Sequence, residues 1–190
     1  MSKPLLIGVV GKMRSGKDTA AAYLADHLQL HQYAFGEPLK VMLKSVFGDH
    51  FHHGDRSGIC PEAGVSYRHL MQTLGTEWAR HQVNPNLWVN LVSKRWHHVK
   101  NRMGFPHANG MVLSDVRFDS EAQWILANGG YLLEIRRQSA EGDAAHESEA
   151  GIDLDFPRYA IDNDGTLEEL YDHLSRVVRV LQPAEAVDGC

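Results

Sequence analysis

The stretch GKMRSGKDT at residues 11–19 constrains the fold more than any other feature of the sequence. It holds two glycines separated by four residues, with a lysine directly after the second. The apolar run LLIGVV precedes it at 5–10, and TAAAYLADHL follows it with apolar residues at helical spacing. A strand, a glycine loop and a helix in this order are the context in which the spacing predicts a phosphate-binding loop, or P-loop.

In a P-loop, backbone N–H groups surround a phosphate and the helix N-terminus adds partial positive charge. Gly11 and Gly16 permit the close backbone approach, and Lys17 is expected to reach the β- and γ-phosphate oxygens of a nucleotide. Asp18 occupies the position where the usual pattern has Ser or Thr. This carboxylate either takes a water bound to Mg²⁺ or leaves the metal to Thr19 and a second acid, and both alternatives stay open.

The rest of the chain alternates between strand and helix patterns. Apolar runs predict strands at 111–115, 131–137 and 158–162, and apolar periodicity predicts helices at 38–47, 68–80, 86–100, 119–128 and 166–181. Asp119 is the expected N-cap of its helix, Gly129 its terminator, and Thr166 with Glu169 a capping box. Such alternation favours an α/β P-loop NTPase fold with a doubly wound parallel sheet of about five strands.

The predicted helix at 68–80 has two different faces. Leu70, Leu74 and Trp78 form an apolar stripe, whereas the side opposite carries polar residues spaced by four, namely Arg68, Gln72, Thr76 and Arg80. We expect one domain over 1–181, in which the helical region 36–100 binds an acceptor and the polar segment 138–156 forms a lid. Residues 182–190 are expected to be a flexible tail.

Composition excludes several functional classes. A net charge of −5 argues against a general nucleic-acid binder, and no apolar run approaches the roughly 20 residues of a membrane helix. The N-terminus lacks the pattern of a signal peptide, so we expect a cytoplasmic protein with no membrane partner. Two cysteines predict free thiols, and the twelve histidines lack companions at zinc-ligand spacing.

Strand ends supply the remaining candidate groups. Asp115 closes an apolar strand and is placed to hold Mg²⁺, and Arg117 follows it. Arg136 and Arg137 close the next strand, where guanidinium groups suit phosphate oxygens. No Ser/His/Asp or Cys/His set is evident, but a phosphate acceptor has a second pKa near 6 and is already an anionic nucleophile at pH 7. A kinase acting on a hydroxyl would need a base, a role also open to Asp115.

Taken together, the motifs resemble the phage-type deoxynucleoside monophosphate kinases, from the nucleoside-monophosphate-kinase branch of P-loop folds. The resemblance spans the chain except the 48–66 loop and the tail, and rests on GKMRSGKDT, FGEPLK, RHLMQTLGTEWAR followed by LW, VLSDVRFDSEA, LLEIRR, HESE and DNDGTLEEL.

The resemblance implies ATP and Mg²⁺ as cofactors, a deoxynucleoside monophosphate as substrate and formation of the diphosphate. It places ATP on Arg14 and Ser15 besides Lys17 and the loop glycines, and catalysis on Asp115 and Arg117, with Arg136 and Arg137 arriving as the lid closes. The acceptor pocket it implies comprises Arg68, Gln72, Glu77, Trp88, Arg117 and Glu149. It gives no role to His146 and Ser148, and it suggests a homodimer.

Two other functions remain open from the sequence. The motif order is also similar to the animal-type phosphomevalonate kinases, which share a loop ending in GKD, a PLK, an SD-x-R strand end and an SE lid motif. RHLMQTLGTEW and DNDGTLEEL favour the nucleotide reading over this one. The third possibility is a nucleotide-binding module without phosphoryl transfer, which would have no need of lid arginines.

Overall fold

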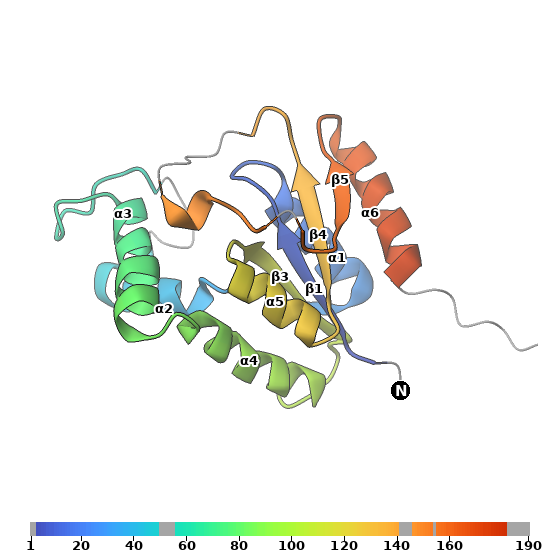
Figure 1. The fold of residues 1–190 in the computed structure, drawn as a ribbon, viewed down its shortest axis with the longest axis horizontal. Helices are drawn as coiled ribbons and strands as arrows, with labels where there is room; N and C mark the ends of the chain where they lie inside the picture. Colours follow the sequence, from blue (N-terminus) through green and yellow to red (C-terminus); the bar gives the residue numbers. More distant parts are fainter. Residues whose placement is uncertain (1–2, 50–55, 141–145, 154, 182–190) are drawn as a thin grey trace, which may run out of the picture.

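The computed structural model describes residues 3–49, 56–140, 146–153 and 155–181, and its centre is a parallel sheet (Figure 1). The strands are β1 (Leu5–Val10), β2 (Leu30–Tyr33), β3 (Gly110–Val116), β4 (Tyr131–Arg136) and β5 (Tyr159–Asp162). They pair in parallel in the order β2-β3-β1-β4-β5. The order reverses direction at β1, so the P-loop that follows β1 lies at the centre of the sheet's carboxyl edge.

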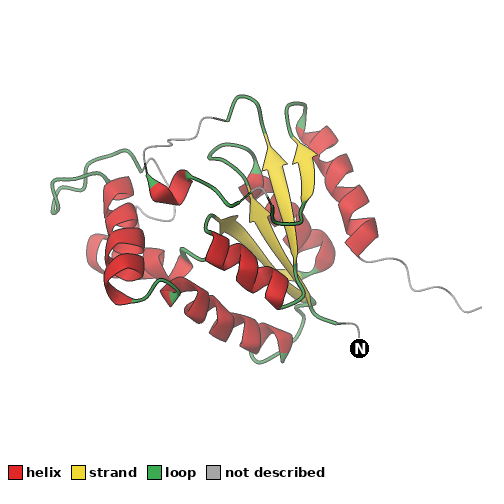
Figure 2. Ribbon diagram, in the orientation of Figure 1, coloured by secondary structure: helices red, strands yellow, loops and turns green. Residues whose placement is uncertain are grey.

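Helices cover both faces of this sheet, as Figure 2 shows. In chain order they are α1 (Lys17–Leu28), α2 (Glu37–Phe47), α3 (Tyr67–Gln72), the π-helix η2 (Thr73–Val83), α4 (Leu87–Lys100), α5 (Asp119–Ala127), the 3₁₀-helix η3 (Glu147–Glu149) and α6 (Leu167–Leu181). The predicted doubly wound α/β architecture is confirmed. No helix in the described part of the chain is long and apolar enough to cross a membrane.

Alternating residues of the three central strands, β1, β3 and β4, pack into two separate cores. In β3, Met111 and Leu113 pack into the core formed with α4 and α5, whereas Val112 packs into the core formed with α1 and α6. This follows from the strand period of two, and it explains why the strands are continuous apolar runs. Both faces are buried, so the sheet holds the loops at its carboxyl edge on a rigid base.

The edge strand β2 was not among the strands predicted by position. Its sequence LHQY carries His31 and Gln32, and only Leu30 of the four residues is buried. A half-exposed edge strand of four residues lacks the apolar run by which the other strands were recognised. It nevertheless directs the chain to Phe35 at the carboxyl edge.

The single helix predicted over 68–80 is instead α3 followed by the wider π-helix η2. The N–H of Asn84 donates to the carbonyl of Ala79, five residues earlier, at 2.8 Å. The buried side of η2 therefore contains Gly75, Thr76, Ala79 and Arg80, and Trp78, predicted to face inward, is 38% exposed. π-Helical turns are concentrated at functional sites, which directs attention to this face.

Two further local predictions needed correction. Asp119 is the first residue of α5, not its N-cap, because the carboxylate of Glu121 takes the capping hydrogen bonds. In α2, Met42 and Val46 are exposed although the apolar periodicity of 38–47 includes them, because the helix meets the core through Leu39, Leu43 and Phe47. The capping box of α6 is confirmed: Glu169 accepts from the N–H of Thr166 at 2.7 Å and donates its own N–H to Thr166 Oγ1 at 3.2 Å.

Candidate active site

A large cavity of about 1250 Å³ lies at the carboxyl edge of the sheet. At one end it is lined by the P-loop and at the other by α3, η2 and α4. Its polar and charged lining includes Arg14, Lys17, Asp18, Arg56, Arg68, Gln72, Thr76, Arg80, Asp115, Arg117 and Glu121. Residues separated by about a hundred positions in the sequence therefore face one space.

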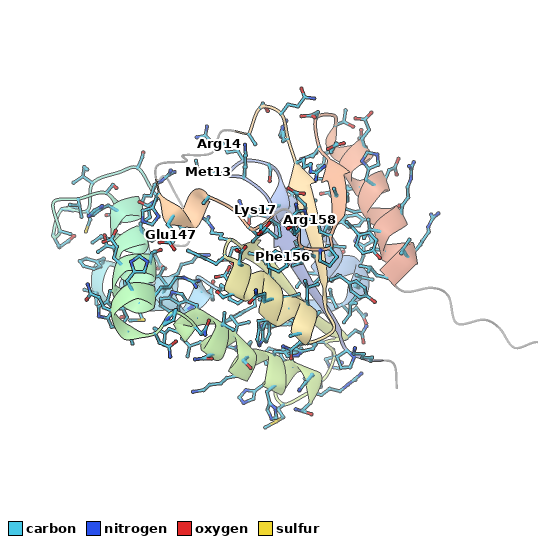
Figure 3. All side chains as sticks on the ribbon, viewed as in Figure 1. Met13, Arg14, Lys17, Glu147, Phe156 and Arg158 are labelled. Carbon is cyan, nitrogen blue, oxygen red and sulfur yellow. The ribbon has the colours of Figure 1, made fainter. Side chains whose placement is uncertain are left out.

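The P-loop directs Lys17 into this cavity (Figure 3). Arg14 and Gly16 have φ angles of 63° and 95°, left-handed values that turn the chain sharply before α1 begins at Lys17. The Nζ of Lys17 lies 3.3 Å from the carbonyl of Lys12, and the side chain is 7% exposed. Gly16, at the N-cap, offers no side chain to cap the helix, so the N-terminal N–H groups of α1 suit an anion.

Not every residue predicted for the nucleotide phosphates lines the cavity. Arg14, Lys17 and Asp18 do, and Ser15 is fully buried beneath the loop. Gly11, Gly16 and Thr19 are absent from the lining. A Cβ at Gly11 would stand 2.6 Å from the carbonyl oxygen of Ile135, so its role is to let the loop pass close to β4.

The turn between β5 and α6 supports the P-loop from behind. The side-chain Nδ2 of Asn163 donates to the carbonyl of Ser15 at 2.8 Å, and Asn163 is buried. A Cβ at Gly16 would collide with this side chain, so Gly16 is required both by its backbone angles and by its neighbour. The DNDG stretch therefore helps to shape the phosphate loop.

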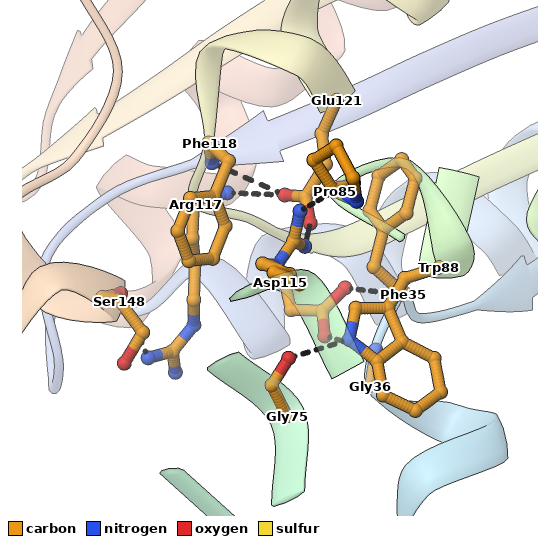
Figure 4. A network of polar contacts seen from close by, with 11 residues as sticks. Phe35, Gly36, Gly75, Pro85, Trp88, Asp115, Arg117, Phe118, Glu121 and Ser148 are labelled. Carbon is orange, nitrogen blue, oxygen red and sulfur yellow. Dashed lines mark hydrogen bonds and ion pairs between the residues drawn. The ribbon is translucent and has the colours of Figure 1, made fainter. Parts of the chain in front are cut away.

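Asp115 joins the end of β3 to the turn after β2. Its Oδ1 accepts from the N–H of Phe35 at 2.6 Å and its Oδ2 accepts from the N–H of Gly36 at 2.9 Å (Figure 4). Both carboxylate oxygens are thus anchored while the residue still lines the cavity. This geometry suits a fixed negative charge better than a base that must take up a proton during the reaction.

Three arginines gather around one position in the cavity, and they are not the three that the sequence suggested. Burial lowers the pKa of Arg56, and the nearby Arg117 and Arg68 lower it further, whereas Asp18 and Asp115 raise it. These side chains come from the 56–66 loop, the end of β3 and α3. Like charges held this close favour an anion between them, and guanidinium groups bind phosphate oxygens in pairs.

The structure does not bring Arg136 and Arg137 to the cavity. Arg136 donates from Nε and Nη2 to Glu134 Oε2, at 3.1 and 2.8 Å, and this bond raises the pKa of Arg136. Residues i and i+2 of a strand share one face, so Glu134 lies beside Arg136 and captures it. Arg137 is exposed and outside the lining. Of the predicted strand-end arginines, only Arg117 lines the cavity in this structure, and the arrival of Arg136 and Arg137 as the lid closes stays a prediction.

The polar stripe predicted on 68–80 does face the cavity. Its four members, Arg68, Gln72, Thr76 and Arg80, all contribute to the lining, as does Trp88. The indole N–H of Trp88 donates to the carbonyl of Gly75 at 2.7 Å and fixes α4 against η2. Glu77 does not line the cavity, and the side chain of Glu149 lies outside what the structure describes.

The segment at 146–149 meets the end of η2 and the end of β3. His81 Nε2 lies 3.0 Å from Glu147 Oε2, and His146 Nε2 lies 3.8 Å from Glu77 Oε1. Arg117 Nη1 donates to the carbonyl of Ser148 at 3.3 Å. His146 and Ser148, which had no predicted role, contact each other through Nδ1 and Oγ at 2.9 Å. Of the predicted lid, residues 141–145 and 154 lie outside the described part, as does the predicted tail, 182–190.

Within the cavity wall, Glu121 and Arg80 form a buried ion pair. Glu121 also accepts from the N–H groups of Arg117 and Phe118, at 2.8 and 3.2 Å (Figure 4). Burial raises the pKa of Glu121 to about 7, with Arg80 acting in the opposite direction. The guanidinium of Arg80 lies 3.8 Å from the centre of the Phe118 ring and donates to the carbonyl of Pro85 at 3.2 Å.

The carboxylates present suit a magnesium ion that is shared with a nucleotide. No group of three or more His, Cys, Asp and Glu side chains within the described ranges could hold a metal alone. Asp18 and Asp115 both line the cavity near Arg56. Mg²⁺ is usually bound by one or two carboxylates together with substrate phosphates and water, so this pair is compatible with it.

Sequence reasoning missed Arg56 and Glu121. Arg56 lies in an aperiodic stretch rich in Gly, His and Asp, where no pattern separates it from its neighbours. For Glu121 a signal existed: an acid in the first turn of a helix, three residues after the last extended residue, predicts a cap.

Comparison with known proteins identifies the family. A family model described as deoxynucleotide monophosphate kinase matches residues 5–59 and 55–174. A candidate deoxynucleotide monophosphate kinase of Acanthamoeba polyphaga mimivirus is 32% identical over 185 residues, covering 90% of this chain and 94% of that protein. The deoxynucleotide monophosphate kinases of Escherichia phage RB69 and Enterobacteria phage T4 are each 29% identical, covering 60% and 61% of this chain. The chain spans only 45% and 46% of those two phage proteins.

Solved structures with similar folds are also P-loop kinases. Shikimate kinase from Aquifex aeolicus aligns with a TM-score of 0.50 and 13% identity, over 93% of this chain and 97% of that one. Dephospho-CoA kinase from Campylobacter jejuni aligns with a TM-score of 0.51 and 12% identity, over 94% and 97%. At such identities the likeness establishes the fold alone. With the family match over most of its length, the chain is a kinase that belongs to the deoxynucleotide monophosphate kinase family.

Proposed function

We propose that this chain transfers the γ-phosphoryl group of ATP to the phosphate of a deoxynucleoside 5′-monophosphate, giving the diphosphate and ADP. The observation that carries the proposal is one continuous cavity that joins the P-loop to the polar face of α3 and η2. Arg56 and Arg117 line the same cavity close to Arg68 of the α3 face. Lys17 binds the β- and γ-phosphate oxygens of ATP, and the polar helix face binds the acceptor.

The acceptor phosphate is the nucleophile in this proposal. Its second pKa is near 6, so one of its oxygens attacks the γ-phosphorus as an anion while the bond to the β-phosphate oxygen breaks. No side chain has to remove a proton. The anchored carboxylate of Asp115 supports this choice over a hydroxyl acceptor, because both of its oxygens already accept backbone hydrogen bonds.

Charge neutralisation is the main task of the protein groups. Lys17 approaches the transferred group from the ATP side, and Arg117, Arg68 and Arg56 approach it from the acceptor side. Asp18 and Asp115 would hold Mg²⁺, which supplies further neutralisation of the β- and γ-oxygens. Arg136 and Arg137 are left out of this arrangement, because neither lines the cavity in this structure.

An ADP-release assay with ATP and Mg²⁺ tests the proposal directly. The acceptor panel contains the four deoxynucleoside monophosphates, the matching ribonucleotides and phosphomevalonate. We expect turnover with at least one deoxynucleotide and none with phosphomevalonate. Turnover with phosphomevalonate alone would show that the acceptor pocket binds phosphomevalonate. ATP binding without turnover of any acceptor would show that the chain is a nucleotide-binding module.

Arg56 provides a prediction that depends on the structure and not on any sequence motif. Replacing it with alanine removes a charged hydrogen-bond donor from the acceptor side, so kcat/KM for the acceptor should fall by about 10- to 100-fold. Arg102→Ala is the matched control, because that arginine is exposed and donates to Pro106 on the loop after α4. Equal kcat/KM values for the acceptor in the two variants would show that Arg56 does not contribute to the site.

A further inference from the structure

The structure assigns Glu121 a role in the reaction: we propose that it is a positioning residue that holds the backbone of Arg117 and ties it to Arg80 on the acceptor face. This inference rests on the proposed function, because it concerns how the arginine on the acceptor side is held during phosphoryl transfer. Glu121 itself touches neither substrate in this scheme. It acts through Arg117.

The burial of Glu121 first shows that it is more than a surface carboxylate. Its side chain is 1% exposed, a condition that glutamates rarely reach unless they are paired. The cost of removing such a charge from water has to be offset by strong partners. Here three donors converge on it: the N–H of Arg117, the N–H of Phe118 and the guanidinium of Arg80.

The same chain contains a glutamate that caps a helix without any of this. Glu169 accepts a hydrogen bond from the N–H of Thr166 at the start of α6 while remaining exposed. In return, the hydroxyl oxygen of Thr166 accepts the N–H of Glu169. Capping a helix therefore requires neither burial nor an arginine. The additional features of Glu121 need another explanation, and they concern the two residues that precede α5.

Those two residues, Arg117 and Phe118, both line the cavity. The end of β3 is fixed at Asp115 by the hydrogen bonds to Phe35 and Gly36, and two residues later Glu121 fixes Arg117 by its N–H. The backbone from which the Arg117 side chain extends is thus held at both ends (Figure 4). Positioning of this kind matters because small displacements of a catalytic group reduce phosphoryl transfer steeply.

Arg80 extends this link to the acceptor face. It lines the cavity together with Phe118, whose ring it covers at 3.8 Å. Its Nε is buried and meets no hydrogen-bond partner among the residues that the structure describes. Through the ion pair, Arg80 on the acceptor face is joined to Glu121 and so to the Arg117 backbone.

A double-mutant cycle between Glu121 and Arg117 tests the inference. Glu121→Gln should lower kcat by about 100-fold in the otherwise unsubstituted protein, with the KM for ATP almost unchanged. If Glu121 acts through Arg117, the same substitution should cost less than about threefold in kcat when made in Arg117→Ala. The measurements are made well below the thermal unfolding midpoint of each variant, at high enzyme concentration for those with Arg117→Ala.

Asp119→Asn is the matched control. This substitution removes a carboxylate charge from the same first turn of α5. The amide oxygen of the asparagine can still accept the N–H of Asp153, which Asp119 Oδ1 accepts at 2.8 Å. Its kcat should stay within about twofold of the parent, as for other exposed substitutions. If Glu121→Gln does not fold, the cycle is run with Glu121→Asp, which keeps the charge but withdraws the carboxylate by one methylene group.

Two results would overturn the inference. An equal loss of kcat from the Glu121 substitution with and without the Arg117 side chain would show that Glu121 is purely structural. An unchanged kcat in Glu121→Gln would show that Glu121 has no role in the reaction. Neither result affects the proposed function, which the parent's turnover of deoxynucleotides tests in the same assay. A parent that turns over no phosphate acceptor would overturn both.

Discussion

Replacing Lys17 with alanine should reduce kcat by about 10³-fold, because it removes a buried cation aimed at the charge that develops on the transferred phosphoryl group. The effect should be large because the side chain is already enclosed and held near the carbonyl of Lys12 before any ligand arrives. Such preorganised charge cannot be replaced by solvent water at the same position. The measurement is steady-state ADP release at saturating ATP, with the acceptor that the panel identifies.

Lys12→Ala is the matched control for this change. Lys12 carries the same charge in the same loop, but its side chain is exposed and does not line the cavity. Near-ultraviolet circular dichroism of the four tryptophans would show whether each variant keeps its fold. Retention of kcat within about tenfold in a folded Lys17→Ala protein would show that the P-loop lysine does not take part in the transfer step.

Arg117→Ala should lower kcat by about 10³-fold, the low end of what arginines that stabilise a transferring phosphoryl group contribute. This guanidinium lines the cavity beside Arg56 and Arg68, so its loss removes one of the three guanidinium groups of this cluster. Arg117→Lys should recover only part of the rate, because an ammonium lacks the planar fork that binds two phosphate oxygens.

Arg176→Ala serves as the reference for this series, since Arg176 lies exposed on α6, which packs on the opposite face of the sheet from α5. The diagnostic comparison is kcat against the KM of the acceptor. A rise in KM with kcat unchanged would mean that Arg117 binds the acceptor equally well in ground and transition states, and the catalytic role proposed for it would be wrong.

Local patterns predicted the parts of this molecule that depend on local sequence. Residues within one short stretch are enough to determine some features. These are the P-loop, four of the five strands and the capping box of α6. The stripe on 68–80 was also recognised, since its spacing by four survives the change from α- to π-helix. Family membership followed from the order of these same motifs.

The errors concern features that depend on which elements become neighbours. Arg136 was expected at the transferred phosphate once the lid closes, and that stays a prediction; in this structure it binds Glu134, its neighbour on the same face of β4. Arg56 reaches the cavity because its backbone carbonyl accepts the N–H of Arg68 at 2.8 Å, a contact that no spacing in the sequence encodes. A buried ion pair between Arg80 and Glu121 likewise joins residues 41 positions apart.

The π-helix makes the acceptor face sensitive to the length of the chain. Arg68 and Arg80 stand at the two ends of the polar stripe, one on α3 and the other on η2. Hydrogen bonds from residue i to residue i+5 make η2 wider than an α-helix, so the chain turns through a smaller angle per residue there. A deletion of one residue within η2 that restored an ordinary α-helix would therefore keep Arg80 on the same side as Arg68, whereas the same deletion without the change of helix type would turn Arg80 away from the cavity and from Glu121. Alignments and engineered chimaeras in this family therefore have to weigh a one-residue gap between these arginines together with the type of helix that joins them.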